Sequence, residues 1–232
     1  MRAVYSAEKG SFPVSWKRPF CYGVHMENVT IHHAVGTDAV ANWIGERIDT
    51  ALAAGSGTVA LTIPGGSTPF PILSELVRQS REWSRLEFWP NDDRIVPEDH
   101  EASNTGKMRS LLEPVGAKVR ALGEDSTPPH FALTWLGMGP DGHIASLFPN
   151  TDPQVSDPQA VRRLTPDPLP PHAPFDRITL TIPALLDTQA VLFTLGGSDE
   201  KRAVFEEAAR GENDLPVARL LGAANQPVTC FA

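Results

Sequence analysis

From Val29 onward, short apolar runs rich in β-branched residues alternate with amphipathic stretches. This alternation constrains the fold more than any other feature, because it is typical of a mostly parallel sheet with helices on both faces. We therefore expect a Rossmann-like, three-layer α/β domain. The clearest helix is predicted by an apolar stripe that recurs every four residues, formed by Val40, Ile44, Ile48 and Leu52.

The same pattern gives bounds for the other elements. We expect strands at Val29–His33, Thr58–Ile63, Leu86–Trp89, Phe131–Leu136, Arg177–Thr181, Val191–Leu195 and Val228–Phe231. We expect helices at Thr37–Ala54, Pro69–Gln79, Asn104–Leu112, Asp199–Arg210 and Val217–Leu221. Between residues 150 and 174 the chain is rich in proline, which is excluded from helix interiors and central strands, so this segment is predicted to be a long surface excursion.

A chain of 232 residues is long enough for one large domain with a buried core. Patterned sequence begins only after Met26, so we expect residues 1–25 to be an N-terminal extension of uncertain order, with Met26 the natural start, and residues 26–232 to form a single α/β domain. The extension has no continuous apolar core of the kind that a signal peptide needs.

The formal net charge is -8, which argues against binding to nucleic acid or to an anionic membrane. No apolar run is long enough to span a bilayer. The two cysteines, Cys21 and Cys230, form no recognised motif and are expected to be reduced thiols, which favours a cytoplasmic protein. We expect a monomer or weak homodimer with a small-molecule partner, and neither a metal nor an organic cofactor, because no metal-ligand motif is present.

The first candidate site is the sequence LTIPGGSTPF, residues 61–70, in which a buried strand leads to Gly65 and Gly66 and then to Ser67 and Thr68. Glycines allow a ligand to approach the backbone closely, and hydroxyls beside the free amides of a helix N-terminus favour an anion. These four residues are candidates for phosphate binding. Capping of the helix that begins at Pro69 explains the same residues equally simply.

The second candidate follows the next strand, where Asn91, Asp92, Asp93 and Arg94 lie at the carboxyl edge of the predicted sheet. Arg94 has the geometry to bind a phosphate bidentately, and the two aspartates could bind sugar hydroxyls or fix Arg94. A solvated charged turn is the alternative for a short run of this kind.

The third candidate is the loop GMGPDGHIASLFP, residues 137–149. Its glycines formally match the dinucleotide fingerprint, but Pro149 leaves no room for the helix that the fingerprint requires. The loop instead presents Asp141 and His143. Histidine is suited to general-base chemistry near neutral pH, and Asp141 is close enough in sequence to orient its ring. A histidine that only satisfies backbone groups is the simpler explanation for the loop taken alone.

The fourth candidate is the glycine pair Gly196-Gly197 that precedes a helix beginning near Asp199. Lys201 falls in the first turn of that helix, where the helix dipole disfavours a cation, so its presence suggests an anion nearby. An exposed lysine paired with a neighbouring acid is the alternative. No nucleophile elbow of the G-x-S-x-G type is present, which favours direct attack by water over a covalent intermediate.

Taken together, these strand-end loops resemble those of the 6-phosphogluconolactonase family, within the sugar-phosphate isomerase-like superfamily that also contains glucosamine-6-phosphate isomerase/deaminase. The resemblance covers about residues 29–228, and its most specific string is LGMG-x-DGH-x-ASLFP. The segments that carry it are PGGSTP (64–69), DDR-x-VP (92–97) with Ser103-Asn104, LGMGPDGHIASLFP (136–149), RITLTIPALLD (177–187) and GGSDEK (196–201).

The resemblance implies hydrolysis of 6-phospho-D-glucono-1,5-lactone to 6-phospho-D-gluconate, the second step of the oxidative pentose phosphate pathway, without a metal or cofactor. It makes His143 the general base, with Asp141 as its orienting partner. It places the phosphate on Gly65, Gly66, Ser67 and Thr68, with Asp92, Arg94 and Lys201 also at the substrate. In this family the residue after the first aspartate is usually Glu, whereas this chain has Asp93.

Two other functions remain open at this stage. The first is glucosamine-6-phosphate deamination or isomerisation, although those relatives continue after the histidine into an Asn-Glu-Pro type segment and this chain reads Ala145-Ser146-Leu147-Phe148-Pro149. The second is a non-catalytic sugar-phosphate sensor, although such proteins usually carry an additional DNA-binding or partner domain.

Overall fold

The computed structural model describes residues 28–169 and 173–232. The predicted extension 1–25 and the predicted start at Met26 lie outside these residues. Within the described ranges, a seven-stranded sheet has the strand order β1-β10-β9-β6-β2-β3-β5, and every adjacent pair is parallel. Its strands are β1 (Val29–His32), β2 (Val59–Ile63), β3 (Leu86–Pro90), β5 (Lys118–Val119), β6 (Leu133–Leu136), β9 (Val191–Thr194) and β10 (Val228–Phe231).

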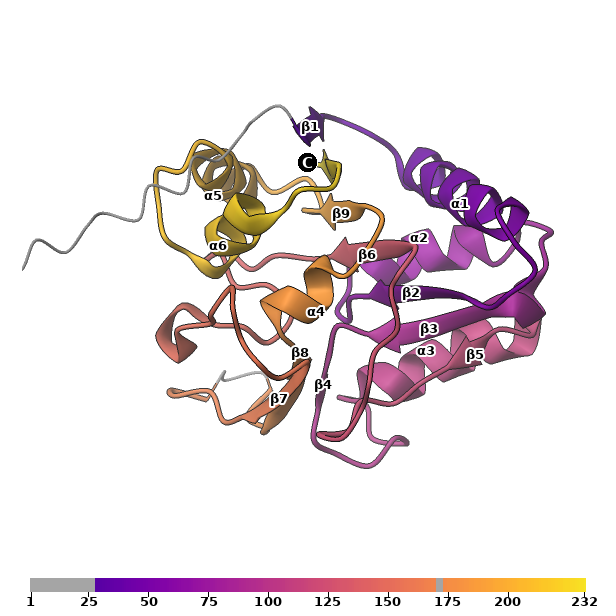
Figure 1. Ribbon diagram of the computed structural model, residues 1–232, viewed down its shortest axis with the longest axis horizontal. Helices are drawn as coiled ribbons and strands as arrows, with labels where there is room; N and C mark the ends of the chain where they lie inside the picture. The colour runs from indigo at the N-terminus through magenta and orange to yellow at the C-terminus, as the bar shows by residue number, and fades with distance from the viewer. Residues whose placement is uncertain (1–27, 170–172) are drawn as a thin grey trace, which may run out of the picture.

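Helices cover both faces of this sheet, as the alternation predicts (Figure 1). One face is covered by α1 (Thr37–Ala53), α2 (Pro69–Leu76) and α3 (Asn104–Leu112), and the other by α4 (Ile182–Leu186), α5 (Asp199–Ala209) and α6 (Pro216–Ala223). Short 3-10 turns are η2 (Trp83–Arg85), η3 (Glu113–Val115) and η4 (Pro149–Thr151). No helix in the described ranges is long and apolar enough to cross a membrane.

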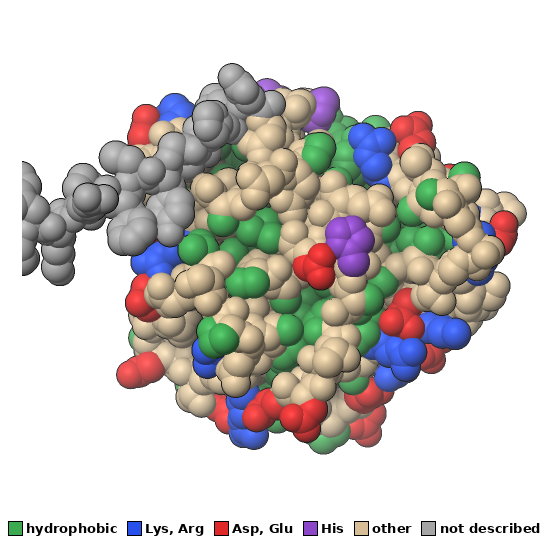
Figure 2. Space-filling view, in the orientation of Figure 1, with side chains coloured by type: hydrophobic (Ala, Val, Ile, Leu, Met, Phe, Trp, Pro, Cys, Tyr) green, Lys and Arg blue, Asp and Glu red, His purple; other side chains and the backbone are tan. Residues whose placement is uncertain are grey.

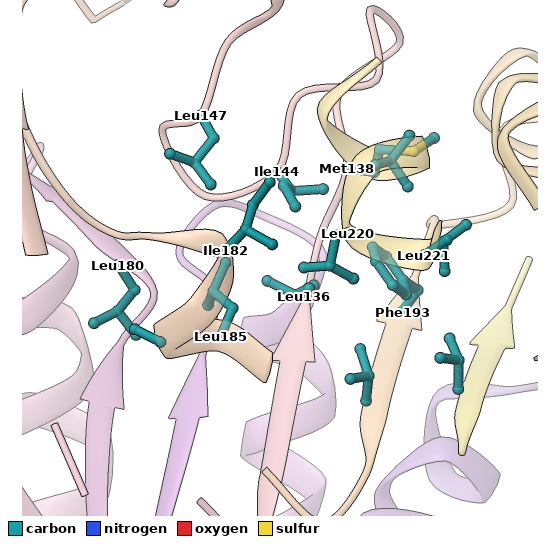
Figure 3. Packing of buried hydrophobic residues seen from close by; sticks show 14 of the residues in the cluster. Leu136, Met138, Ile144, Leu147, Leu180, Ile182, Leu185, Phe193, Leu220 and Leu221 are labelled. Carbon is teal, nitrogen blue, oxygen red and sulfur yellow. The ribbon is translucent and has the colours of Figure 1, made fainter. Parts of the chain in front are cut away.

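Alternation along the strands divides the core into two layers. In β6, Leu133 and Trp135 face the cluster under α1, α2 and α3, whereas Leu136 faces the cluster under α4, α5 and α6. Figure 3 shows the second cluster, in which Phe193 from β9 lies beside Leu220 and Leu221 of α6. The three-layer arrangement is thus specified by side chains that alternate on buried strands.

A second sheet corrects one of the expectations. The strand predicted at Arg177–Thr181 is expected in the parallel sheet, but Arg177–Leu180 forms β8 of a separate antiparallel sheet with the order β4-β8-β7. Its other strands are β4 (Asp92–Arg94) and β7 (Val161–Leu164). The Pro-rich segment therefore holds a strand and is only partly a loop. Its prolines lie outside the four residues Val161–Leu164, so the backbone there remains free to pair.

The remaining differences are local. The helix expected to reach Gln79 ends at Leu76, and the strand expected to begin at Phe131 begins at Leu133. The short elements α4, β4 and β5 were not predicted, because two to five residues are too few for a period to be recognised.

Candidate active site

Four adjacent strands of the large sheet, in the order β9-β6-β2-β3, end at one edge, and each leads into one of the four candidate loops. Ligands bind at this edge in open parallel sheets. A cavity of about 340 Å³ lies there, a size suited to a small ligand. Eight of the predicted site residues line it, namely Gly65, Gly66, Ser67, Thr68, Asp92, Arg94, His143 and Lys201.

Asp141, the ninth predicted residue, lies behind the histidine. Its Oδ1 is 2.6 Å from Nδ1 of His143 and 3.3 Å from the backbone nitrogen of the same residue. The hydrogen bond from His143 holds the pKa of the Asp141 carboxyl below its ordinary value. An ionised Asp141 fixes the proton on Nδ1, so Nε2 carries the free lone pair of the ring.

The loop that carries this pair is held tightly from both sides. A Cβ on Gly139 would lie 2.2 Å from the ring of His143 and 2.5 Å from Oδ1 of Asp141, so a larger residue there would have to displace this pair. On the other side, Ile144 and Leu147 insert into the core under α4 and α6 (Figure 3). No helix follows within residues 137–148, which agrees with the rejection of a dinucleotide fingerprint.

The glycine-rich loop after β2 contacts its neighbours on both sides. A Cβ on Gly65 would lie 2.1 Å from Oδ1 of Asn104, and a Cβ on Gly196 would lie 3.0 Å from Oγ1 of Thr68. Thr68 precedes α2, yet its side chain makes no capping hydrogen bond among the described residues. Capping therefore does not account for Thr68, which lines the cavity.

Asn104 links the first loop to the second. Its side-chain amide donates to the backbone oxygen of Asp92 at 2.9 Å, and its Oδ1 accepts from Nη1 of Arg94 at 3.2 Å. The same Arg94 nitrogen donates to the backbone oxygen of Ala102. Two acceptors thus fix the guanidinium of Arg94 beside the glycine-rich loop.

The two aspartates of the second loop have different environments. Asp93 is buried, and its carboxylate accepts from the backbone nitrogens of Arg94, Asn104 and Thr105 at 2.6–2.8 Å. It stabilises the N-terminus of α3 and does not line the cavity, so the suggestion that it binds a sugar hydroxyl is wrong. Asp93 does hold Arg94, but through the backbone nitrogen and not through the guanidinium.

Asp92, in contrast, lines the cavity and accepts a hydrogen bond from Oγ of Ser146. Burial raises the pKa of Asp92, while the Ser146 hydrogen bond and the charges of Arg94 and Arg177 oppose part of that rise. Ser146 belongs to the histidine loop, so this contact joins the second and third candidate loops.

The fourth loop brings Lys201 to the same cavity. Ser198 caps α5 by accepting from the backbone nitrogen of Lys201, which places this lysine in the first turn of the helix. Its ammonium makes no ion pair among the described residues, unlike Arg202 beside it, which pairs with Asp199. The alternative that Lys201 pairs with a neighbouring acid is therefore not what the structure shows.

Sequence reasoning missed four polar side chains that line the cavity, namely Asn104, Ser146, Arg177 and Thr194. Asn104, Ser146 and Arg177 lie in segments that carried the family resemblance, but none of them was assigned a role. In the described ranges, no group of three His, Cys, Asp or Glu side chains is placed to hold a metal ion.

Comparison with known proteins agrees with this geometry. The family model described as glucosamine-6-phosphate isomerases/6-phosphogluconolactonase matches residues 33–118 and 113–229. A 6-phosphogluconolactonase of Mesorhizobium japonicum is 30% identical over 83% of this chain and 89% of its own length. One from Neisseria meningitidis serogroup A is 32% identical over 83% of this chain and 90% of its own length.

A solved structure has the same fold. The crystal structure of a 6-phosphogluconolactonase from Shewanella baltica superposes with a TM-score of 0.74 at 24% identity, over 89% of this chain and 98% of the other. The family model and the curated relatives both span most of the chain. The chain therefore belongs to the family of glucosamine-6-phosphate isomerases and 6-phosphogluconolactonases.

Proposed function

We propose that the protein hydrolyses 6-phospho-D-glucono-1,5-lactone to 6-phospho-D-gluconate. The observation that carries this proposal is the Asp141–His143 pair at the wall of a cavity that also holds a glycine-rich loop and the cations Arg94 and Lys201. A general base and an anion site in one small cavity suit a substrate with a hydrolysable carbonyl at one end and a phosphate at the other.

The phosphate end is held by the glycine-rich loop, with Arg94 on one side of it and Lys201 on the other. Backbone amides and hydroxyls of Gly65, Gly66, Ser67 and Thr68 are donors of the kind that phosphate oxygens accept. Fixing the phosphate also fixes the lactone carbonyl relative to His143, so the reaction gains from proximity.

At the other end, Nε2 of His143 takes a proton from water while the water oxygen bonds to C1 of the lactone. The bond between C1 and the ring oxygen then breaks, and the proton passes from the imidazolium to that oxygen, which becomes the C5 hydroxyl. Asp141 stabilises the transient imidazolium through Nδ1. A base of this type contributes roughly 10²–10⁴-fold to the rate.

The test measures hydrolysis of the phosphorylated lactone directly. Acid release is the readout, and the rate of spontaneous ring opening is subtracted. We expect activity in the native protein, and a loss of roughly 10²–10⁴-fold in His143→Gln with an unchanged circular dichroism spectrum. Turnover by His143→Gln near that of the native protein would refute the assignment of the base.

Deamination of glucosamine 6-phosphate is tested in parallel by ammonia release. The segment from Ala145 to Phe148 that follows the histidine contains no carboxylate, and its Ser146 hydroxyl is already bonded to Asp92. We expect no ammonia. Release of ammonia without lactone hydrolysis would favour deamination as the function. Binding of the sugar phosphates without hydrolysis or deamination would indicate a sensor.

The proposal also covers the location, domain organisation and oligomeric state of the protein. We infer a cytoplasmic enzyme with residues 26–232 as one domain, acting as a monomer or weak homodimer without nucleic acid. On the face shown in Figure 2, acidic and basic side chains are interspersed with apolar ones, and no broad basic surface appears. Sedimentation at several concentrations tests the oligomeric state.

A further inference from the structure

Two arginines stand directly opposite each other beside the substrate cavity. Arg94 in β4 is paired with Arg177 in β8 in the antiparallel register, and both line the cavity. Like charges in directly opposed positions destabilise a sheet. Arg177 is removed from solvent, with only 3% of its surface exposed, and Arg94 is half-buried. An arrangement of this kind needs a compensating negative charge.

The charges of Asp92 and Asp93 supply part of that compensation, but no carboxylate among the described residues forms an ion pair with either arginine. Nη2 of Arg177 donates to the backbone oxygen of Ala173 at 2.8 Å, whereas its buried Nη1 has no partner among the described residues. The buried Nε of Arg94 has none there either. Burial, and then the charge of Arg94, lower the pKa of Arg177 below its ordinary value. An unpaired donor on a buried cation is costly, so both groups are suited to an anionic ligand.

The charges that line the cavity indicate which anion this is. Apart from His143, three cations (Arg94, Arg177 and Lys201) face one carboxylate, that of Asp92. The excess of two positive charges with Asp92 ionised matches a phosphate monoester, whose charge near neutral pH is about −1.5 to −2. A neutral sugar lactone without phosphate would leave this excess uncompensated.

We propose that Arg177 binds the phosphate of the substrate together with Arg94, and that this opposed pair makes the site selective for the phosphorylated lactone over the neutral one. The inference rests on the proposed lactone hydrolysis. It adds a recognition residue from the second sheet, and it explains why a like-charged pair is kept opposite in β4 and β8.

The experiment compares two substrates in three variants. Hydrolysis of 6-phosphogluconolactone and of glucono-1,5-lactone is measured for the native protein, Arg177→Met and Arg177→Lys. Since a hydrogen-bonded charge pair is lost, we expect Arg177→Met to lower kcat/KM for the phosphorylated lactone by roughly 10–100-fold. The value for the neutral lactone should stay within about twofold of the native one, because no phosphate is there to be held. Lysine keeps the charge but not the fork geometry, so Arg177→Lys should fall between the two.

A matched control is Arg163→Met. Arg163 is an exposed arginine of β7 in the same sheet, paired with Asp176 outside the cavity, and its loss should leave both substrates unaffected. Equal losses on both substrates in Arg177→Met would overturn the inference, because they would indicate oxyanion stabilisation or a structural role. Unchanged kinetics on both substrates would overturn it as well.

A binding measurement separates this inference from the proposed function. Inorganic phosphate is titrated into each variant by calorimetry, and circular dichroism confirms the fold. The native protein should bind phosphate, Arg177→Met at least tenfold more weakly, and Arg163→Met as the native protein does. A native protein that binds phosphate but hydrolyses no lactone would refute the proposed function alone. Equal phosphate binding by native protein and Arg177→Met would refute the role of Arg177 alone. If Arg177→Met does not fold, Arg177→Lys provides the same comparison.

Discussion

Replacing Asp141 by asparagine tests the histidine pair directly. The substitution keeps the size of the side chain and its hydrogen-bond acceptor, but it removes the charge that faces the imidazolium formed during turnover. Because His143 lines the cavity and Asp141 does not, the change should act on kcat and leave KM for the phosphorylated lactone nearly unchanged.

The magnitude follows from the geometry of the pair. A hydrogen bond to a charged group contributes roughly 1.5–3 kcal/mol. The contact is short, at 2.6 Å, but the side chain of Asp141 is 50% exposed, so solvent screens part of the interaction. The lower part of the range, about 1.5–2 kcal/mol, is therefore appropriate and corresponds to a loss in kcat of roughly 10–30-fold.

The chain contains a matched control for this variant. His130 and Asp187 form a pair of the same geometry, with Nδ1 and Oδ1 also 2.6 Å apart, and neither residue lines the substrate cavity. Asp187→Asn should leave kcat and KM at native values. The reasoning is refuted if Asp141→Asn turns over at the native rate, or if Asp187→Asn loses as much activity as Asp141→Asn.

Three further outcomes are expected. Gly139→Ala should keep the fold but lower kcat more than tenfold, because the new methyl group displaces the ring of His143; Gly55→Ala, where a Cβ meets nothing within 4 Å, is the control in the same hydrolysis assay. Asp93→Ala should lower the free energy of unfolding in urea by at least about 2 kcal/mol, since three backbone nitrogens lose their acceptor. The third outcome concerns how the stability of the folded protein depends on pH. Asp141 has a lowered pKa in the folded protein, so its stabilising contribution is complete above the unfolded value of about 3.9 and is lost as the pH falls through the lower folded value. The stability difference between native protein and Asp141→Asn in urea should therefore shrink as the pH falls below about 4; a difference that grew below this pH would contradict the reasoning.

The parts of the site that sequence predicts are those set by local chemistry. The glycine pair Gly65-Gly66, the proposed base His143 and its neighbour Asp141 lie within short segments that follow strands, and a parallel sheet brings the ends of its strands to one edge. The positions of these residues therefore follow once the alternation has been recognised. Each motif alone had a simpler explanation, and only the common edge favoured function.

The missed residues depend on pairings between distant segments. Arg177 begins a strand that looks like any other buried strand, and nothing local shows that β8 pairs with β4, more than 80 positions earlier, and not with the large sheet. The opposition of Arg94 and Arg177 follows from that register alone. Asp93 was misread for a similar reason, since the amides that it accepts from belong to α3, about ten residues further on.

The small antiparallel sheet gives the Pro-rich segment a function that its composition conceals. β7 pairs with β8, and β8 pairs with β4, so the segment supports the two strands that carry Arg94 and Arg177 (Figure 1). The large sheet positions the glycine-rich loop, His143 and Lys201, whereas the small sheet positions the arginine pair. The cavity is thus formed where the two sheets meet, and a pair of opposed cations can be held there because each arginine is fixed by a backbone ladder and not by a flexible loop.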